Sequence, residues 1–143
     1  PAPPKRGEQI PPLQLEPVFE GDRLDYLFTG GRPSLLFFWS TWCKACMLAI
    51  PKLRTWAVKH DLQVLAITSE DPHIVRAVLN NTPLPFPALY DRGSEVSRLF
   101  HVDLQITRAP VIVYLDVERR LIERGIGMGE EGPAQIEILF ESK

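Results

Sequence analysis

The feature that most constrains this chain is the position of its two cysteines, Cys43 and Cys46, directly after an apolar segment of strand length. Residues 34–39 read Ser-Leu-Leu-Phe-Phe-Trp, which is typical of a buried strand, and helical spacing of apolar residues begins near Cys46. The pair is therefore expected where a strand leads into a helix. Residues three apart on a helix share one face, so the two sulfurs can close a disulfide or release one.

The first cysteine is expected to cap the helix, and this position favours a particular chemistry. Unpaired backbone N–H groups and the positive end of the helix dipole stabilise an anion there, and the thiolate is the form that attacks a disulfide. We therefore predict that Cys43 is the nucleophile and Cys46 the resolving thiol. Lys44 is expected to lower the pKa of Cys43 by its charge, and a solvated lysine of little effect is the alternative.

Size and charge exclude several classes of protein. A chain of 143 residues can bury roughly two thirds of its unfolded surface, so a single domain needs no disulfide to complete its core. Sixteen basic and eighteen acidic side chains give a net charge of −2, unlike the basic stripe of a nucleic-acid-binding protein. No apolar run approaches the roughly 20 residues that cross a bilayer, so this region is predicted to be soluble.

Strand and helix patterns alternate along the chain. Strands are predicted at 34–39, 63–68, 111–115 and 121–126, the last as an antiparallel return, with a short extended segment at 88–90. Helices are predicted near 21–29, 43–60 with a kink at Pro51, 72–80, 94–102 and 132–140. Such alternation predicts the α/β class, a mixed central sheet with helices on both faces.

The amino end is rich in proline. It opens Pro-Ala-Pro-Pro without an initiator methionine, and further prolines follow at positions 11, 12 and 17. Such segments favour extended conformations and serve as semi-rigid spacers. We therefore predict an N-terminal extension over 1–17 and a folded domain over 18–143. A trimmed chain that has lost a signal or membrane anchor is one interpretation, and an arbitrary boundary is the other.

Three features together resemble the thioredoxin superfamily: the stretch Phe38–Cys46, Pro51 five positions after the second cysteine, and Arg108-Ala109-Pro110-Val111 ahead of a strand. The extra helix and strand inserted between Asp71 and Asp103, and the N-terminal extension, are similar to the periplasmic or membrane-tethered branch that contains TlpA, ResA and CcmG.

The resemblance implies a thioredoxin fold and a thiol–disulfide oxidoreductase without a cofactor, whose partners are proteins that carry cysteines or disulfides. It implies a reductant in cytochrome c maturation or in the maintenance of metal-site thiols, with an upstream membrane electron donor and a periplasmic or other extracytoplasmic location. Trp42 would pack beside the active site and contribute to substrate binding. Pro110 would be a cis-proline that turns the Ala109 backbone toward the cysteines for substrate docking.

Two positions depart from the family pattern. Phe37 stands where thioredoxin has a buried aspartate, and Ala49 stands where ResA-like proteins have a glutamate. Those carboxylates are proposed to manage the proton of the resolving thiol. Water, another acid such as Glu70, or no group at all would have that task here.

Two other functions are the alternatives. A Cu(I)-binding metallochaperone of the same fold would use the soft thiolates, although copper chaperones of this fold space their cysteines one residue wider. A redox-inactive interaction module would keep the fold alone, which the intact cysteine pair argues against. No metal site is predicted, because zinc sites of this kind need a second cysteine pair and the three histidines lack ligand spacing.

Overall fold

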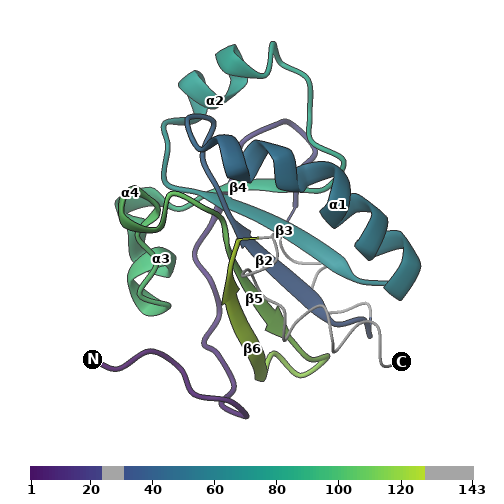
Figure 1. The fold of residues 1–143 in the computed structure, drawn as a ribbon, viewed down its shortest axis with the longest axis vertical. Coiled ribbons are helices and arrows are strands. Elements are labelled where there is room, and N and C mark those ends of the chain that lie inside the picture. The colour runs from purple at the N-terminus through teal and green to yellow at the C-terminus, as the bar shows by residue number, and fades with distance from the viewer. Residues whose placement is uncertain (24–30, 128–143) are drawn as a thin grey trace.

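The structure, a computed structural model, describes residues 1–23 and 31–127. A sheet with the strand order β1-β4-β3-β2-β5-β6 forms its centre (Figure 1). The strands are β1 (Glu16–Pro17), β2 (Ser34–Phe38), β3 (Gln63–Thr68), β4 (Ala88–Tyr90), β5 (Val111–Leu115) and β6 (Leu121–Ile126). The helices are α1 (Lys44–His60), α2 (Pro72–Val78), α3 (Glu95–Leu99) and α4 (Leu104–Thr107), with a 3₁₀ turn at Arg92–Ser94.

The sheet is mixed, as predicted. Strand β2 lies inside it, parallel to β3 and antiparallel to β5. Strands β3 and β4 are parallel, and the outer strands β1 and β6 run antiparallel to β4 and β5. Parallel neighbours need a crossover, and α1 and α2 supply the two crossovers between β2, β3 and β4. The predicted α/β class and the antiparallel return at 121–126 are confirmed.

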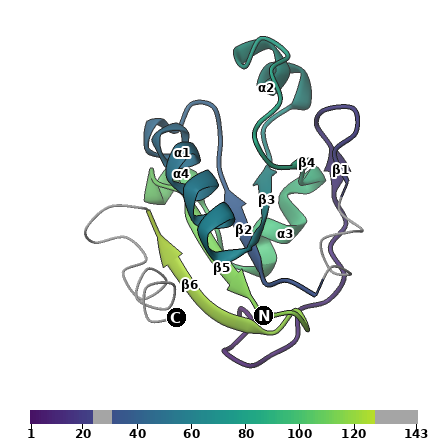
Figure 2. The ribbon, with the colours of Figure 1, turned by 90° about the vertical axis from the view of Figure 1, so that its right-hand side faces the viewer.

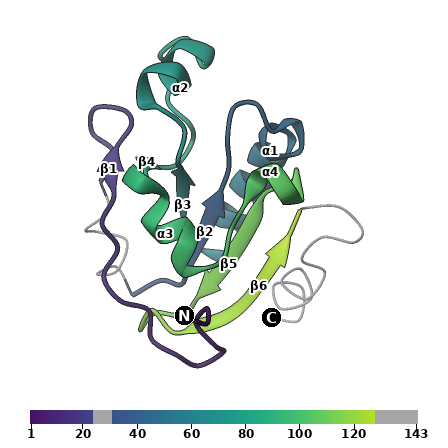
Figure 3. The same cartoon turned by 90° about the vertical axis from the view of Figure 1, so that its left-hand side faces the viewer.

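Alternate strand residues enter two separate cores, because successive side chains point to opposite faces of a sheet. On one face, Phe37 packs in a buried cluster with Leu53 of α1. On the other, Phe38 packs with Phe100 at the end of α3, with ring centroids 5.9 Å apart. Figures 2 and 3 show α1 and α3 on these opposite faces. Continuous apolar runs in β2, β3 and β5 follow from burial on both sides.

Helix α1 begins and ends with recognisable caps. Cys43 is its N-cap, as predicted, and Asp61 ends it in the left-handed region at φ 52°. Lys59 and His60 place positive charge in the last turn, where the helix dipole favours it. Pro51 lies inside α1, and the helix continues past it to His60.

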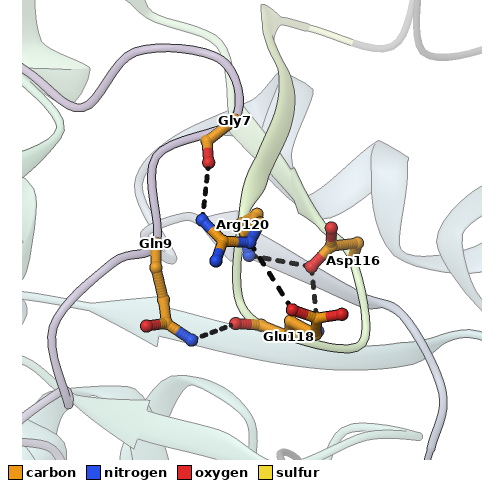
Figure 4. Close-up of polar contacts among 5 residues, drawn as sticks. All are labelled: Gly7, Gln9, Asp116, Glu118 and Arg120. Carbon is orange, nitrogen blue, oxygen red and sulfur yellow. Dashed lines mark hydrogen bonds and ion pairs between the residues drawn. The ribbon is translucent and has the colours of Figure 1, made fainter.

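The amino-terminal segment differs from the predicted spacer, because it is hydrogen-bonded to the turn between β5 and β6. The Gly7 N–H donates to the Leu121 carbonyl at 2.8 Å. Figure 4 shows the side-chain contacts: the Arg120 guanidinium donates to the Gly7 carbonyl at 3.0 Å, and the Gln9 amide donates to the Glu118 carbonyl at 2.7 Å. The segment therefore adds to this end of the sheet instead of leaving it.

Apolar residues between the prolines explain this packing. Ile10 and Leu13 are 1% and 7% exposed and belong to the core on the α3 face. Further on, Glu16 pairs with β4 and accepts two hydrogen bonds from the Arg92 guanidinium, at 2.7 Å and 3.0 Å. Arg92 thereby lowers the pKa of Glu16. Residues from Gly7 onward therefore pack against the rest of the domain, and the predicted division at residue 18 stays a prediction.

The helix predicted at 132–140, and most of that predicted at 21–29, lie outside the described residues. Across residues 1–23 and 31–127, no helix combines the length and the apolar character that a membrane crossing requires. Strand β1 and the short helix α4 are present although no pattern predicted them.

Candidate active site

A disulfide joins Cys43 and Cys46 at the first turn of α1, with 5.2 Å between the two Cα atoms. Cys43 has an extended backbone (φ −88°, ψ 100°), and its Sγ accepts a hydrogen bond from the Cys46 N–H at 3.2 Å. This is the contact that a serine or aspartate side chain makes when it caps a helix. The same N–H would stabilise a Cys43 thiolate once the disulfide opens.

Both cysteines are buried, with Cys43 2% and Cys46 0% exposed, but only Cys43 is among the residues that line the pocket described next. Cys43 lines a pocket of about 420 Å³, called the Cys43 pocket below, whose other lining residues are Trp42, Lys44, Ala45, Leu48 and Arg108. Cys46 is fully buried and shares an apolar cluster with Phe37 and Ala49. Cys43, which lines the pocket, is therefore the cysteine that an incoming sulfur atom can approach.

That cluster contains Phe37 and Ala49, the two positions that depart from the pattern of the resemblance. Phe37 is fully buried and Ala49 is 2% exposed, and both contribute only apolar surface around the disulfide. Glu70, the remaining acid considered from the sequence, lies elsewhere. Its carboxylate contacts Thr41, two residues before Cys43.

Glu70 anchors the turn that carries the disulfide. Its Oε1 accepts from the Thr41 backbone N–H at 2.8 Å, and the Thr41 hydroxyl lies 2.9 Å and 2.7 Å from the two carboxylate oxygens. The Glu70 N–H in turn donates to the hydroxyl of Thr68, the last residue of β3, at 3.0 Å. The end of β3 thus holds the segment between β2 and α1 in place. Sequence reasoning treated Glu70 as a proton carrier or a dipole partner and missed this contact.

Trp42 is half exposed and lines two pockets. One is the Cys43 pocket, and the second, of about 520 Å³, lies at the carboxyl ends of β2 and β3 beside α3 and α4. Its predicted role in substrate contact stays a prediction, and its position beside Cys43 is compatible with it.

The structure contradicts the predicted cis-proline at Pro110. The bond between Ala109 and Pro110 is trans, which is the preferred isomer of X–Pro bonds by about 0.5–1 kcal/mol. The chain turns instead at Arg108, which ends α4 in the left-handed region, and the Thr107 hydroxyl donates to the Ala109 carbonyl at 2.9 Å. Val111, the next residue, pairs with Phe38 at the end of β2. Ala109 and Pro110 therefore approach the cysteine end of the sheet, and their docking role stays a prediction.

Arg108 is the residue that sequence reasoning overlooked. It lines the Cys43 pocket although it lies 65 positions further along the chain. Because β5 is antiparallel to β2, the start of β5 must lie beside the end of β2, close to the cysteines. The antiparallel pairing of β5 with β2 is the signal that could have drawn attention to Arg108. Lys44 is exposed at the same pocket, and its effect on Cys43 stays a prediction.

Metal-binding groups were sought in the same region. Over the two described ranges, no three His, Cys, Asp or Glu side chains gather in a way that could hold a metal ion.

Comparison with known proteins assigns the family. The AhpC/TSA family matches residues 7–121, which is most of the chain. The chain belongs to the AhpC/TSA family. This AhpC/TSA chain is 25% identical over 135 residues to the thiol-disulfide oxidoreductase ResA of Bacillus thuringiensis (strain Al Hakam), covering 92% of this chain and 74% of ResA.

Solved structures of this AhpC/TSA chain's relatives show the same fold. A Chlorobium tepidum protein described as thiol:disulfide interchange protein DsbE is similar with a TM-score of 0.72 at 20% identity, covering 96% of this chain and 94% of the other. The exposed lipoprotein thioredoxin Etrx1 of Streptococcus pneumoniae strain TIGR4 gives 0.68 at 20% identity, covering 90% and 97%. The thioredoxin fold and the resemblance to ResA-like proteins are confirmed. Fold, disulfide and relatives together support thiol–disulfide oxidoreductase activity.

Proposed function

We propose that this protein is a thiol–disulfide oxidoreductase that reduces disulfides in partner proteins through Cys43 and Cys46. The observation that carries the proposal is the disulfide at the first turn of α1, with Cys43 lining the pocket and Cys46 in the buried apolar cluster. This arrangement suits a nucleophile that meets the partner and a resolving thiol that meets only the nucleophile.

The exchange has two steps. The Cys43 thiolate attacks one sulfur of the partner's disulfide, forms a mixed disulfide, and releases the other partner sulfur as a thiolate that takes up a proton. The Cys46 thiol then loses its proton and attacks Cys43 Sγ, which frees the second partner thiol and closes the Cys43–Cys46 disulfide. Two electrons and two protons pass to the partner. A dithiol donor upstream restores the reduced form by the reverse reaction.

Neighbouring residues position this chemistry. The Cys46 N–H supports the Cys43 thiolate, and Glu70 fixes the preceding turn through Thr41. Trp42 offers an exposed aromatic surface to the partner.

The proposed partners and location follow from the resemblance. Proteins of cytochrome c maturation, or proteins whose metal-site thiols must stay reduced, are the proposed substrates, and a membrane protein is the proposed electron donor. An extracytoplasmic location, with a membrane tether in the full-length chain, is supported by the likeness to Etrx1, described as an exposed lipoprotein.

Cysteine variants test the proposal. With dithiothreitol as the reductant, the wild-type protein should speed the reduction of insulin disulfides, and Cys43→Ser should lose this activity because no nucleophile remains. Cys46→Ser should instead accumulate a mixed disulfide through Cys43, visible by non-reducing electrophoresis and by mass spectrometry. Full activity in Cys43→Ser would contradict the assigned nucleophile. An anaerobic Cu(I) titration tests the metallochaperone alternative, which predicts tight stoichiometric binding without exchange.

A further inference from the structure

Two cations lie at the Cys43 pocket. Lys44 and Arg108 are both exposed, and among the described residues they are the only charged ones that line it. Within residues 1–23 and 31–127, neither side chain forms an ion pair with an acid. The pocket therefore presents two positive charges that the described part of the molecule does not neutralise.

The rest of the pocket wall is apolar and exposed. Trp42 and Leu48 are 50% and 69% exposed, and Ala45 lies between them in sequence. Large apolar side chains that remain in water beside a reactive group are a common feature of surfaces that bind a partner. At about 420 Å³, the pocket has room for a few side chains of a partner and not for a folded element.

The backbone at Arg108 is left-handed, as it is at six other non-glycine residues of the described part of the chain. Arg108 ends α4 at φ 52° and ψ 25°, and its N–H donates to the Leu104 carbonyl at 2.9 Å. Glycine is the usual residue at such a left-handed helix end, because a side chain is strained there. Arg108 lines the same pocket as Cys43, and Figure 3 shows α4 at the end of the sheet where α1 begins.

We propose that the Cys43 pocket binds an extended segment of the partner protein that carries a carboxylate close to its cysteine, with Lys44 and Arg108 contacting the acid and Trp42 and Leu48 contacting apolar neighbours. This inference rests on the proposed function and adds the class of substrate that the site prefers.

The net charge of the whole chain does not favour an acidic substrate. With a net charge of −2, the protein as a whole repels an acidic peptide weakly at long range. A preference for acidic substrates must therefore come from the local pair of cations. Opposite charges at close range raise association rates by tenfold or more, and added salt removes much of that gain.

Matched peptide disulfides test the preference. Two peptides of equal length would carry one cysteine between leucines, flanked by aspartate in one and by lysine in the other, each in a mixed disulfide with 2-mercaptoethanol. Stopped-flow fluorescence of Trp42 would follow oxidation of the reduced protein. Each rate constant is divided by that of dithiothreitol with the same peptide, which removes intrinsic differences in disulfide reactivity.

The corrected rate constant for the acidic peptide is then divided by that for the basic peptide. This ratio reports on docking and not on nucleophilicity, because the same Cys43 thiolate attacks both peptides. We expect a ratio of about ten at low ionic strength that falls toward one in high salt. Arg108→Glu should bring the ratio close to one, and Arg108→Lys should keep most of it. Arg108→Gly should lower it to about three without loss of stability, because glycine relieves the left-handed backbone.

Arg54→Glu is the control. Arg54 is exposed on α1 outside the Cys43 pocket, and its replacement makes the same change in net charge. The ratio should stay near the wild-type value in this variant. A wild-type ratio near one, or an equal fall in Arg54→Glu and Arg108→Glu, would overturn the inference while leaving exchange itself intact. Failure to reduce even neutral hydroxyethyl disulfide would instead overturn the proposed function.

Discussion

Removing the Glu70 carboxylate should loosen the turn that carries the disulfide. The carboxylate accepts from two donors of Thr41, the backbone N–H and the hydroxyl, at distances of 2.7–2.9 Å. A hydrogen bond to a charged group contributes roughly 1.5–3 kcal/mol, and both residues are only partly buried, so the lower end applies. We expect Glu70→Ala to lower the free energy of unfolding by about 2–3 kcal/mol.

Urea unfolding of the oxidised protein measures this loss. Glu70→Gln should lose only about 1 kcal/mol, because the amide oxygen still accepts from the Thr41 N–H although its charge is gone. Glu20→Ala is the matched control, since Glu20 is exposed, and it should change stability by less than about 0.5 kcal/mol.

A double-mutant cycle tests the specific contact. Thr41→Ala removes the hydroxyl and keeps the N–H, so the cycle with Glu70→Ala reports on the hydroxyl–carboxylate pair alone. We expect a coupling of about 1 kcal/mol. Additivity within about 0.3 kcal/mol, or a Glu70→Ala loss no larger than that of Glu20→Ala, would refute the anchoring role.

Two further predictions concern pH and redox potential. Burial raises the pKa of Asp22, whose carboxylate accepts from the Ala88 N–H at 3.1 Å. Because the Asp22 carboxyl keeps its proton more readily in the folded protein, its contribution to stability is complete below the unfolded pKa of about 4. This contribution is lost as the pH rises through the higher folded pKa. Asp22→Asn should therefore gain stability relative to wild type between about pH 4 and pH 7, measured by urea midpoints, and an unchanged difference would contradict this. Equilibration of the Cys43–Cys46 pair with glutathione should give a potential nearer to about −270 mV than to about −120 mV, as a reductant requires, and the opposite result would reverse the proposed direction.

Much of the fold was predictable, because the strands that build the centre are buried on both sides. The strands Ser34–Phe38, Gln63–Thr68 and Val111–Leu115 are buried throughout, and their sequences are apolar apart from polar residues at the ends of the first two. The helix after Cys43 was equally predictable from the sequence, because a capping residue and a stripe of apolar residues mark it. Strand β1 was not, because two residues that include a proline carry no pattern and depend on β4 for their hydrogen bonds.

The site was predicted where its chemistry is local in sequence and missed where it is not. Cys43 and Cys46 can be identified from their spacing in the sequence. Arg108 and Glu70 reach the same turn only through the folded chain, from the start of β5 and the end of β3.

The register of the sheet also places the amino-terminal segment relative to the cysteines. Leu115 pairs with Ser34, so the turn that holds Gly7 lies at the opposite end of β2 from the cysteines. Figure 1 shows the amino terminus far from the start of α1. A segment attached ahead of Pro1 would therefore leave the domain far from the Cys43 pocket, and passing proteins could reach that pocket without meeting the attachment.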